Sequence, residues 1–456
     1  MRADQGRGFV FRHILRGLAA IMLLIVAGGA GWLYLSPPEL LRVGSGYAAK
    51  IVCSNVFLAG RDAEKVLAED VQAPGNPLLR LMRVAVDPNG RRVDAALLGW
   101  IAPSLAIYRD GAGCTVVPDG AMPAELSVPV QAASEPLDGL WPTGNKDQVD
   151  PMLQAVVSDR ALTGPGMRGV VVVKDGRLAA ETYGDGFSAS MPLLGWSMTK
   201  TVTAAIIGRL VAEGKISLEE KNLFPAWKDD ARAGIRLADL LSMESGLAFN
   251  ENYGSVADVT RMLFLEPDMA RFVESLPLEA GIGSRFTYSS GTPVLLSKIW
   301  MAHAGSAEEA LAYPQKALFA PLGMRSAVIE TDAAGTFVGS SYMYATARDW
   351  ARLGLFLAQD GVWQGNRLLP QGFVGEMQEK NASSGGRYSR MQTWLPKPGS
   401  GLPGDTFILS GHDGQNVFVI PSMKLVIVRL GLTPRGAGYD ATTLASAIVR
   451  KVRGEE

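Results

Sequence analysis

The chain has 456 residues, of which 47% are hydrophobic and 20% charged, a normal globular composition at a length that suggests more than one domain. Its formal net charge of −1, without a long basic run after the N-terminus, argues against a nucleic-acid partner. Three histidines and two cysteines, with no C-x-x-C pair, offer little material for a metal site, so we expect neither a metal nor another cofactor.

The N-terminus carries the pattern of a membrane segment. Four arginines up to Arg16 precede an uninterrupted apolar run from Gly17 to Leu35, long enough to cross a bilayer as one helix. A cleaved signal peptide is the alternative, because Gly28-Gly29-Ala30 offers small residues to a protease, but the apolar run continues beyond that point. We therefore predict that residues 1–40 form a single-pass anchor in the inner membrane. The basic flank stays cytoplasmic, which places the rest of the chain on the periplasmic side.

Residues 41–131 have mostly strand-like patterns and predict a small β-rich module. Its clearest element is a hairpin over 81–98, centred on an Asp-Pro-Asn-Gly turn. The two cysteines could be buried thiols, but an exported chain meets an oxidising compartment, and there a disulfide between Cys53 and Cys114 is favoured. Residues 132–149 contain proline and glycine among polar residues, and they are predicted to be a linker.

Residues 150–456 are predicted to form one larger domain. A short amphipathic helix over 151–160 is followed by an apolar hairpin over 169–183 with an Asp-Gly turn. A second hairpin over 417–430 and a helix over 441–452 close the chain. Strands at both ends of a long helix-rich middle predict an α/β fold of the α+β type, in which helices flank one antiparallel sheet completed by the C-terminal hairpin.

The sequence Gly195-Trp196-Ser197-Met198-Thr199-Lys200 opens an apolar-periodic helix that is predicted to begin at or just before Ser197 and to end near Gly214. Ser197 could simply be an N-cap, but a capping box favours Glu or Gln where this helix has Lys200. A cation in the first turn opposes the helix dipole and adds nothing to the fold. Residues three apart share a helix face, so a desolvated Lys200 could take the proton of Ser197.

Two later motifs could belong to the same site. Tyr288-Ser289-Ser290 precedes another helical pattern, although Tyr288 taken alone would be an ordinary half-buried tyrosine. His412-Asp413-Gly414-Gln415 stands directly before a predicted strand. Taken alone this is a loop with a solvated histidine, but glycine there lets the backbone approach a ligand and leaves strand-edge N–H groups free.

The order Ser-x-x-Lys, Tyr-Ser-Ser and His-Asp-Gly before a late strand resembles the serine β-lactamase and penicillin-binding-protein superfamily, and most of all its class C-related esterases and 6-aminohexanoate-dimer hydrolases. The resemblance covers roughly residue 150 to the C-terminus and implies a β-lactamase-like fold. It implies that Ser197 is the nucleophile and that Lys200 and Tyr288 share the proton transfers, with a Tyr288 phenolate as the favoured base. It also implies an oxyanion hole formed by the backbone N–H groups of Ser197 and Gln415.

Two positions depart from the family's motifs. Ser290 stands where Tyr-x-Asn has asparagine, and His412 stands where penicillin-recognising members have the lysine of Lys-Thr-Gly. Both departures point away from β-lactams and toward esters or linear amides, so the resemblance implies a serine hydrolase for a small-molecule ester or amide. The candidate substrate-binding residues are Trp196, Tyr253, Ser290, His412, Gly414 and Trp394.

Three other functions remain open. A Ser-His-Asp hydrolase would need His412, because no G-x-S-x-G elbow surrounds Ser197 and His303 lies in a helical segment. A weak β-lactamase or D-Ala-D-Ala peptidase would use the same residues as the esterase. A non-catalytic receptor of the same fold would bind a cell-wall peptide or a small amide, but such a protein is expected to lose Ser197, Lys200 or Tyr288, and all three are present.

Overall fold

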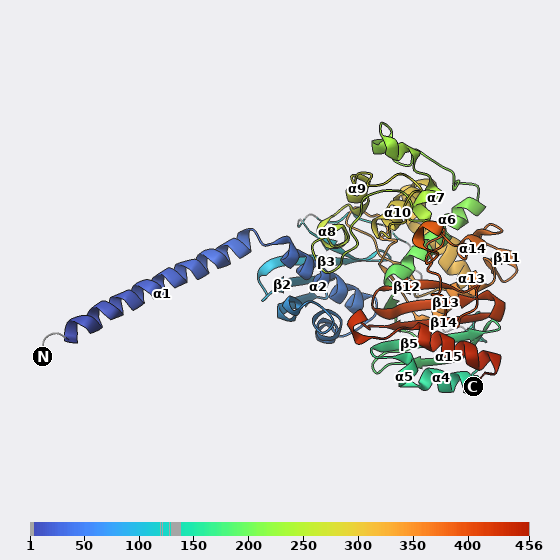
Figure 1. Cartoon of the computed structure of the whole chain (residues 1–456), viewed down its shortest axis with the longest axis horizontal. Coiled ribbons are helices and arrows are strands. Elements are labelled where there is room, and N and C mark those ends of the chain that lie inside the picture. Colours follow the sequence, from blue (N-terminus) through green and yellow to red (C-terminus); the bar gives the residue numbers. More distant parts are fainter. Residues whose placement is uncertain (1–3, 119, 121, 127, 129–137, 456) are drawn as a thin grey trace.

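The computed structural model describes residues 4–118, 120, 122–126, 128 and 138–455. Figure 1 shows a long N-terminal helix, α1 (Asp4–Leu35), which projects from the body of the molecule. The most apolar 18-residue window within its segment Phe11–Leu35 has a mean hydropathy of 2.1, and this window is not buried against the rest of the chain. This helix is therefore apolar enough to be a membrane anchor or a signal sequence.

Residues 39–117, which we call the N-terminal module, contain one long helix packed on a sheet. The helix is α2 (Glu39–Phe57), and the four antiparallel strands lie in the order β1-β2-β3-β4. Their bounds are β1 (Met82–Asp87), β2 (Arg92–Leu97), β3 (Ile101–Arg109) and β4 (Gly113–Val117). The predicted hairpin over 81–98 is confirmed as β1 and β2. A disulfide between Cys53 and Cys114 joins α2 to β4.

The strand-like prediction is wrong for the first part of 41–131. That part contains α2, α3 (Ala63–Val66) and a π-helical segment, Leu67–Gln72. Every residue of α2 from 48 to 55 is buried, so the helix lacks the polar face that would reveal it in the sequence. Its glycines also disfavour helix, but a Cβ at Gly46 would lie only 3.1 Å from the Cβ of Phe264 in α8 (Asp258–Leu265), so glycine allows the close contact.

A five-stranded antiparallel sheet in the order β12-β13-β14-β5-β6 forms the centre of the larger domain. Both predicted hairpins are confirmed, and β14 pairs with β5, so that Leu425 lies opposite Lys174. The two ends of the domain therefore form one sheet, as predicted. The strands are β5 (Met167–Lys174), β6 (Arg177–Tyr183), β12 (Phe407–Gly411), β13 (Gln415–Ile420) and β14 (Leu425–Gly431).

Helices cover both faces of this sheet. Val170 and Val172 of β5 face a core shared with the terminal helices, while Val171 and Val173 face the main core, which explains the unbroken valine run. Figure 1 shows the terminal helices together on one side, and their bounds are α4 (Pro151–Ser158), α5 (Arg160–Thr163) and α15 (Thr442–Arg453). The predicted helices over 151–160 and 441–452 are thus confirmed. Helix α13 (Ala347–Ala358) covers the opposite face.

The segment between β6 and β12 is rich in helices, as predicted. Besides α8 and α13 it contains α6 (Thr199–Ala212), α7 (Leu237–Leu241), α9 (Met269–Glu274), α10 (Gly291–His303), α11 (Ala307–Pro314), α12 (Ala320–Leu322) and α14 (Phe373–Glu376). Its short strands are β7 (Leu193–Leu194), β8 (Val328–Ile329), β9 (Met343–Ala345), β10 (Val362–Trp363) and β11 (Asn366–Arg367). Buried side chains of the N-terminal module and of this segment belong to one continuous apolar cluster.

Candidate active site

Ser197 lies in a short 3-10 turn, Trp196–Met198, which leads directly into α6. Trp196 has a φ of +48°, a left-handed conformation that strains any residue except glycine. Gly195 allows a close contact before the turn, since a Cβ there would lie 2.3 Å from the Trp350 ring. Trp196 and Met198 are buried whereas Ser197 is only half-buried, so this strained turn presents the serine.

Lys200 lies in the first turn of α6 with its ammonium beside the Ser197 hydroxyl. Lys200 Nζ is 3.0 Å from Ser197 Oγ, 3.0 Å from Ser290 Oγ and 3.1 Å from the Ser340 carbonyl oxygen. The lysine is 1% exposed, and burial lowers its pKa to about 8, although the negative charge of Glu251 opposes this shift. A lysine with that pKa is neutral in part of the molecules near neutral pH, so it can accept a proton.

Tyr288 completes the predicted trio from the segment before α10. Its ring centroid is 4.9 Å from Lys200 Nζ, and Trp394 lies against it with ring centroids 5.2 Å apart. Burial raises the pKa of the Tyr288 phenol and the charge of Glu251 raises it further, while hydrogen bonds with Ser197 and Trp394 lower it. The net shift is upward, so the phenol holds its proton more firmly than an exposed tyrosine does.

Glu251, in the loop between α7 and α8, contacts this group although it was not predicted as a site residue. Its carboxylate accepts hydrogen bonds from the Ser290 backbone N–H at 2.7 Å and from the Ser290 hydroxyl at 2.5 Å. Ser290 is fully buried and also receives the bond from Lys200, so it links the lysine to the carboxylate. A loop glutamate 39 residues before its partner belongs to no periodic pattern that could have revealed it.

Three of the predicted pocket residues stack beside the Ser197 turn. The rings of His412 and Tyr253 are parallel, with centroids 5.4 Å apart, and the Trp196 ring meets His412 edge-on at 5.6 Å. Tyr253 Oη also lies 3.5 Å from Ser290 Oγ. The His412 side chain is 45% exposed, so this aromatic stack has one polar group in contact with solvent.

Hydrogen bonds with strand β14 fix the turn that carries His412. Arg429 is fully buried, and its Nη1 donates a hydrogen bond of 2.9 Å to the Gly414 carbonyl oxygen. Gly414 has a φ of +85°, and a Cβ there would lie 2.6 Å from the same nitrogen, so this position favours glycine. The Gln415 side chain bonds the backbone of Gly431 in β14, accepting its N–H at 2.9 Å and donating to its carbonyl oxygen. The Gln415 side chain is therefore engaged with β14, so any contact between Gln415 and a substrate would come from its backbone.

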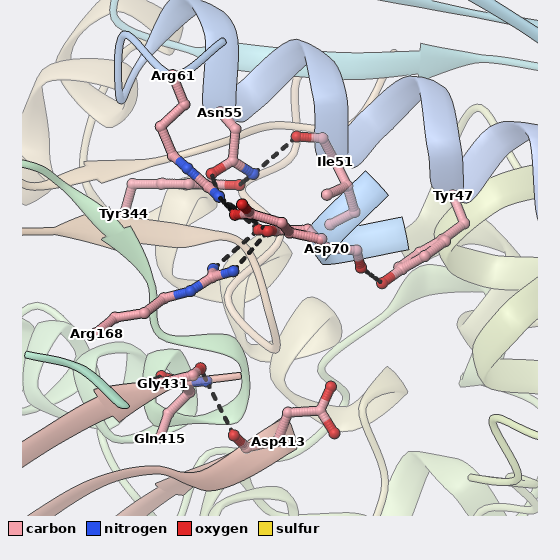
Figure 2. Close-up of polar contacts among 11 residues, drawn as sticks. Tyr47, Ile51, Asn55, Arg61, Asp70, Arg168, Tyr344, Asp413, Gln415 and Gly431 are labelled. Carbon is pink, nitrogen blue, oxygen red and sulfur yellow. Dashed lines mark hydrogen bonds and ion pairs between the residues drawn. The ribbon is translucent and has the colours of Figure 1, made fainter. Parts of the chain in front are cut away.

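Residues of the N-terminal module also lie near this turn, and Figure 2 shows Tyr47 and Asp70 together with Asp413 and Gln415. Asp70, in the π-helical segment, accepts two hydrogen bonds from Arg61, at 2.6 and 3.0 Å, and two from Arg168 in β5, at 2.8 and 2.5 Å. Burial raises the pKa of Asp413, and the positive charges of His412 and Arg168 oppose that shift. Asp70 and Arg168 border a cavity of about 30 Å³ whose wall also includes Trp196 and Gln415.

A Ser-His-Asp site would need His412, whose Nε2 lies 3.4 Å from Asp413 Oδ1, but none of the described hydrogen bonds joins His412 to Ser197. His303 does not offer an alternative. Both ring nitrogens of His303 are engaged elsewhere, Nδ1 with the Ile299 carbonyl oxygen at 2.9 Å and Nε2 with Glu220 at 3.1 Å. The serine instead receives the lysine's hydrogen bond. Within the part of the chain that the structure describes, no cluster of three or more His, Cys, Asp or Glu side chains is arranged to hold a metal ion.

A sequence profile of the beta-lactamase family matches residues 158–448, more than half of the chain. The chain belongs to the beta-lactamase family. A 6-aminohexanoate-dimer hydrolase from Paenarthrobacter ureafaciens is 26% identical to this family member over 388 residues, which cover 79% of this chain and 90% of that protein. The prediction of a serine β-lactamase and penicillin-binding-protein superfamily member is thus confirmed, and the protein belongs to a family of β-lactamase-fold serine hydrolases.

Solved structures share the fold of this beta-lactamase family member. A candidate 6-aminohexanoate-dimer hydrolase from Bacillus anthracis has a TM-score of 0.58 at 21% identity and covers 68% of this chain and 88% of its own. A family VIII carboxylesterase has a TM-score of 0.53 at 15% identity and covers 67% of this chain and 99% of its own. The antiparallel sheet flanked by helices is therefore the β-lactamase-like fold that the motifs predict.

Proposed function

We propose that this protein hydrolyses a small-molecule ester or linear amide through an acyl-enzyme on Ser197. The observation that carries the proposal is the 3.0 Å contact between Lys200 Nζ and Ser197 Oγ, at a buried position where the lysine pKa falls to about 8. The similarity to a 6-aminohexanoate-dimer hydrolase supports a linear amide, and the carboxylesterase fold is compatible with an ester. His412, in place of a permanently charged lysine, weighs against a β-lactam carboxylate.

In the proposed acylation, Ser197 Oγ attacks the substrate carbonyl carbon while its proton passes to neutral Lys200. The carbonyl oxygen becomes an oxyanion, stabilised by the backbone N–H groups of Ser197 and Gln415. When the C–O or C–N bond breaks, the leaving alcohol or amine takes the phenolic proton of Tyr288, which regains one from the Lys200 ammonium. Water then attacks the acyl-enzyme in the same way, its proton passing to Lys200, and the acid is released as Ser197 is protonated again.

This scheme makes Lys200 the base, whereas the sequence-based interpretation favoured a Tyr288 phenolate. The two pKa shifts support the change, because burial lowers the pKa of Lys200 and raises that of Tyr288. Lys200 can then accept a proton as a neutral amine, and the Tyr288 phenol keeps its proton and can donate it to the leaving group as a general acid.

The first test combines active-site labelling with a substrate panel. We expect a fluorophosphonate probe to label Ser197 in the full-length protein, and we expect turnover of p-nitrophenyl acetate or 6-aminohexanoate dimer with little hydrolysis of nitrocefin. Peptide mapping identifies the labelled residue. Dominant nitrocefin or D-Ala-D-Ala peptide turnover would support the β-lactamase or peptidase alternative instead. A folded protein that takes no label would support the receptor alternative.

The pH dependence of kcat/KM tests the role of Lys200. If the neutral amine is the base, kcat/KM should rise about tenfold per pH unit below its pKa and level off above about 8. The negative charge of Glu251 raises that pKa, so Glu251→Gln should move the rise to lower pH. Glu279→Gln, at an exposed glutamate paired with Arg285, is the matched control and should leave the profile unchanged. A Glu251→Gln profile identical to the wild type would remove Lys200 from this role.

We also propose that α1 is an uncleaved anchor in the inner membrane, with the hydrolase domain on the periplasmic side. The basic residues Arg12 and Arg16, which precede the apolar run within α1, support this orientation. The disulfide between Cys53 and Cys114 supports an oxidising compartment. Carbonate extraction of membranes and protease digestion of spheroplasts test this topology, and a soluble mature protein lacking α1 would contradict it.

A further inference from the structure

We infer that one edge of the N-terminal module lies in the headgroup region of the bilayer that holds α1. This edge, which we call the apolar rim, consists of Leu40, Leu78, Leu81, Leu98 and Trp100. The inference rests on the proposed anchoring of α1 and goes beyond it, because an anchor alone leaves the body free to tumble on its tether. A rim buried in lipid fixes which side of the enzyme faces the membrane.

The rim is unusual in its exposure. Each of its five side chains is between 40% and 50% exposed. Among the described residues after Met152, which include all of 153–455, no large hydrophobic side chain is exposed, so the surface of the hydrolase domain has nothing comparable. Of the other exposed large hydrophobic residues described outside α1, three lie in the connection between the two parts, Met122, Leu140 and Val149, and one, Met152, lies in the first turn of α4.

The rim also lies at the end of α1. The Leu98 N–H donates a hydrogen bond of 2.9 Å to the Leu81 carbonyl oxygen, which joins the β2–β3 turn to the 3-10 helix Pro77–Leu81. That 3-10 helix contacts both α2 and β2. Leu33, in the last turn of α1, packs against the main apolar cluster, and α1 contacts β3 of the module. Figure 1 shows the module on the side of the body from which α1 emerges.

The backbone of the β2–β3 turn adds a second, independent observation. Leu98 has a φ of +54° and Gly99 a φ of +87°. Two successive residues with positive φ ordinarily are Asn-Gly or Gly-Gly, because a leucine is strained in this conformation. Leu98 therefore adds both backbone strain and exposed apolar surface, and neither helps the isolated module to fold. Insertion into the bilayer interface would offset both costs.

The polar groups beside the rim fit a lipid surface. Trp100 lies in the rim, and Trp32 and Tyr34 are exposed in the last turn of α1; such amphipathic rings are enriched at membrane interfaces. Arg80 and Arg83 are exposed next to the rim, and a Cβ at Gly99 would lie 3.9 Å from the Arg83 side chain. Guanidinium groups in the headgroup region of a bilayer pair with the phosphates of anionic lipids.

The test uses the full-length protein in nanodiscs that contain anionic lipid. The chain has only two cysteines and they form the disulfide, so Leu98→Cys supplies one reactive thiol for the environment-sensitive dye NBD. Asn89→Cys is the matched control, since Asn89 lies in the exposed turn at the opposite end of the same hairpin, about 20 Å away along the six-residue β2. We expect the dye at 98 to emit at shorter wavelength and to lose most of its fluorescence to a nitroxide on the lipid headgroup. The dye at 89 should show neither effect.

Three other results would overturn the inference, each for a different reason. If the protein enters the nanodiscs but the two dyes behave alike, the rim lies in water and the anchoring still stands. If the protein does not enter the nanodiscs, the anchoring fails and the rim has no bilayer to meet. If the dye at 98 emits at shorter wavelength without lipid quenching, and only in discs that hold two chains, a second copy covers the rim.

Discussion

Ser197→Ala is expected to lower kcat/KM for p-nitrophenyl acetate by roughly 10⁶-fold, the scale of loss when a serine hydrolase loses its nucleophile. The hydroxyl is the group that forms the acyl-enzyme, and the variant leaves Lys200 without the proton donor that it contacts at 3.0 Å. The strained turn at Trp196 and the packing of Gly195 against Trp350 remain, so the fold should be unchanged. Initial rates and fluorophosphonate labelling measure the loss, and circular dichroism verifies the fold.

Ser190→Ala is the matched control for this experiment. Ser190 is an exposed serine seven positions before Ser197 in the chain, and its hydroxyl contacts only Ser188 among the described hydrogen bonds, at 3.1 Å. The control variant should retain full activity and full labelling. A folded Ser197→Ala variant that still hydrolyses the ester at the wild-type rate would require a different nucleophile, and the acyl-enzyme proposal would be abandoned.

Replacing Glu330 with alanine should lower the free energy of unfolding by about 3–5 kcal/mol, as expected when one partner of a buried ion pair is removed. Glu330 pairs with Lys50 of α2, and the two side chains are 0% and 2% exposed. The carboxylate also accepts hydrogen bonds from Ser54 Oγ at 2.8 Å and from the Cys114 N–H at 2.6 Å. The substitution leaves an uncompensated ammonium and two unpaired donors inside the protein.

Denaturant unfolding of a double-mutant cycle separates these terms. Lys50→Met combined with Glu330→Gln removes both charges, so the double variant should be less destabilised than the sum of the single variants. Burial lowers the pKa of Lys50 and Glu330 opposes this, so Glu330→Ala lowers that pKa further. The unfolded chain then binds more protons than the folded one, and the variant should regain stability as the pH rises.

An exposed ion pair in the N-terminal module is the control for losing a charge that is not buried. Arg91 and Asp110 are 2.6 Å apart but 48% and 58% exposed, so Asp110→Ala should leave the unfolding midpoint at its wild-type value. Equal losses for Asp110→Ala and Glu330→Ala would mean that burial does not decide how much the loss of an ion pair costs.

The short motifs around the candidate site could be predicted because their spacing follows backbone geometry. Residues three apart on a helix share a face, and the structure does bring Lys200 to Ser197. The hairpins around the Asp-Gly and Asp-Pro-Asn-Gly turns were predicted because such turns constrain both flanking strands. In these places the local sequence determines the local structure.

The parts that escaped prediction depend on contacts between distant residues. Helix α2 is buried along its middle, so it has no apolar stripe for a periodicity argument to detect. Glu251 meets Ser290 because two loops converge, and Arg429 holds Gly414 from within a strand that otherwise has the pattern of apolar core. No pattern along the chain distinguishes such a glutamate or arginine from an exposed one, because its role depends on residues that contact it only in the folded protein.

The strand order β12-β13-β14-β5-β6 also determines when, during synthesis of the chain, the candidate site can form. Ser197 lies near the beginning of the hydrolase domain and the His412–Gln415 turn near its end, and β14 must pair with β5 across almost all of that domain. Pairing over such a long stretch is slow, because the chain pays the loop-closure entropy before the contacts form. A nascent chain that emerges N-terminus first therefore has no assembled site until its last strands have been synthesised. Synthesis of the chain should thus be essentially complete, and in the proposed topology its export also, before any activity appears.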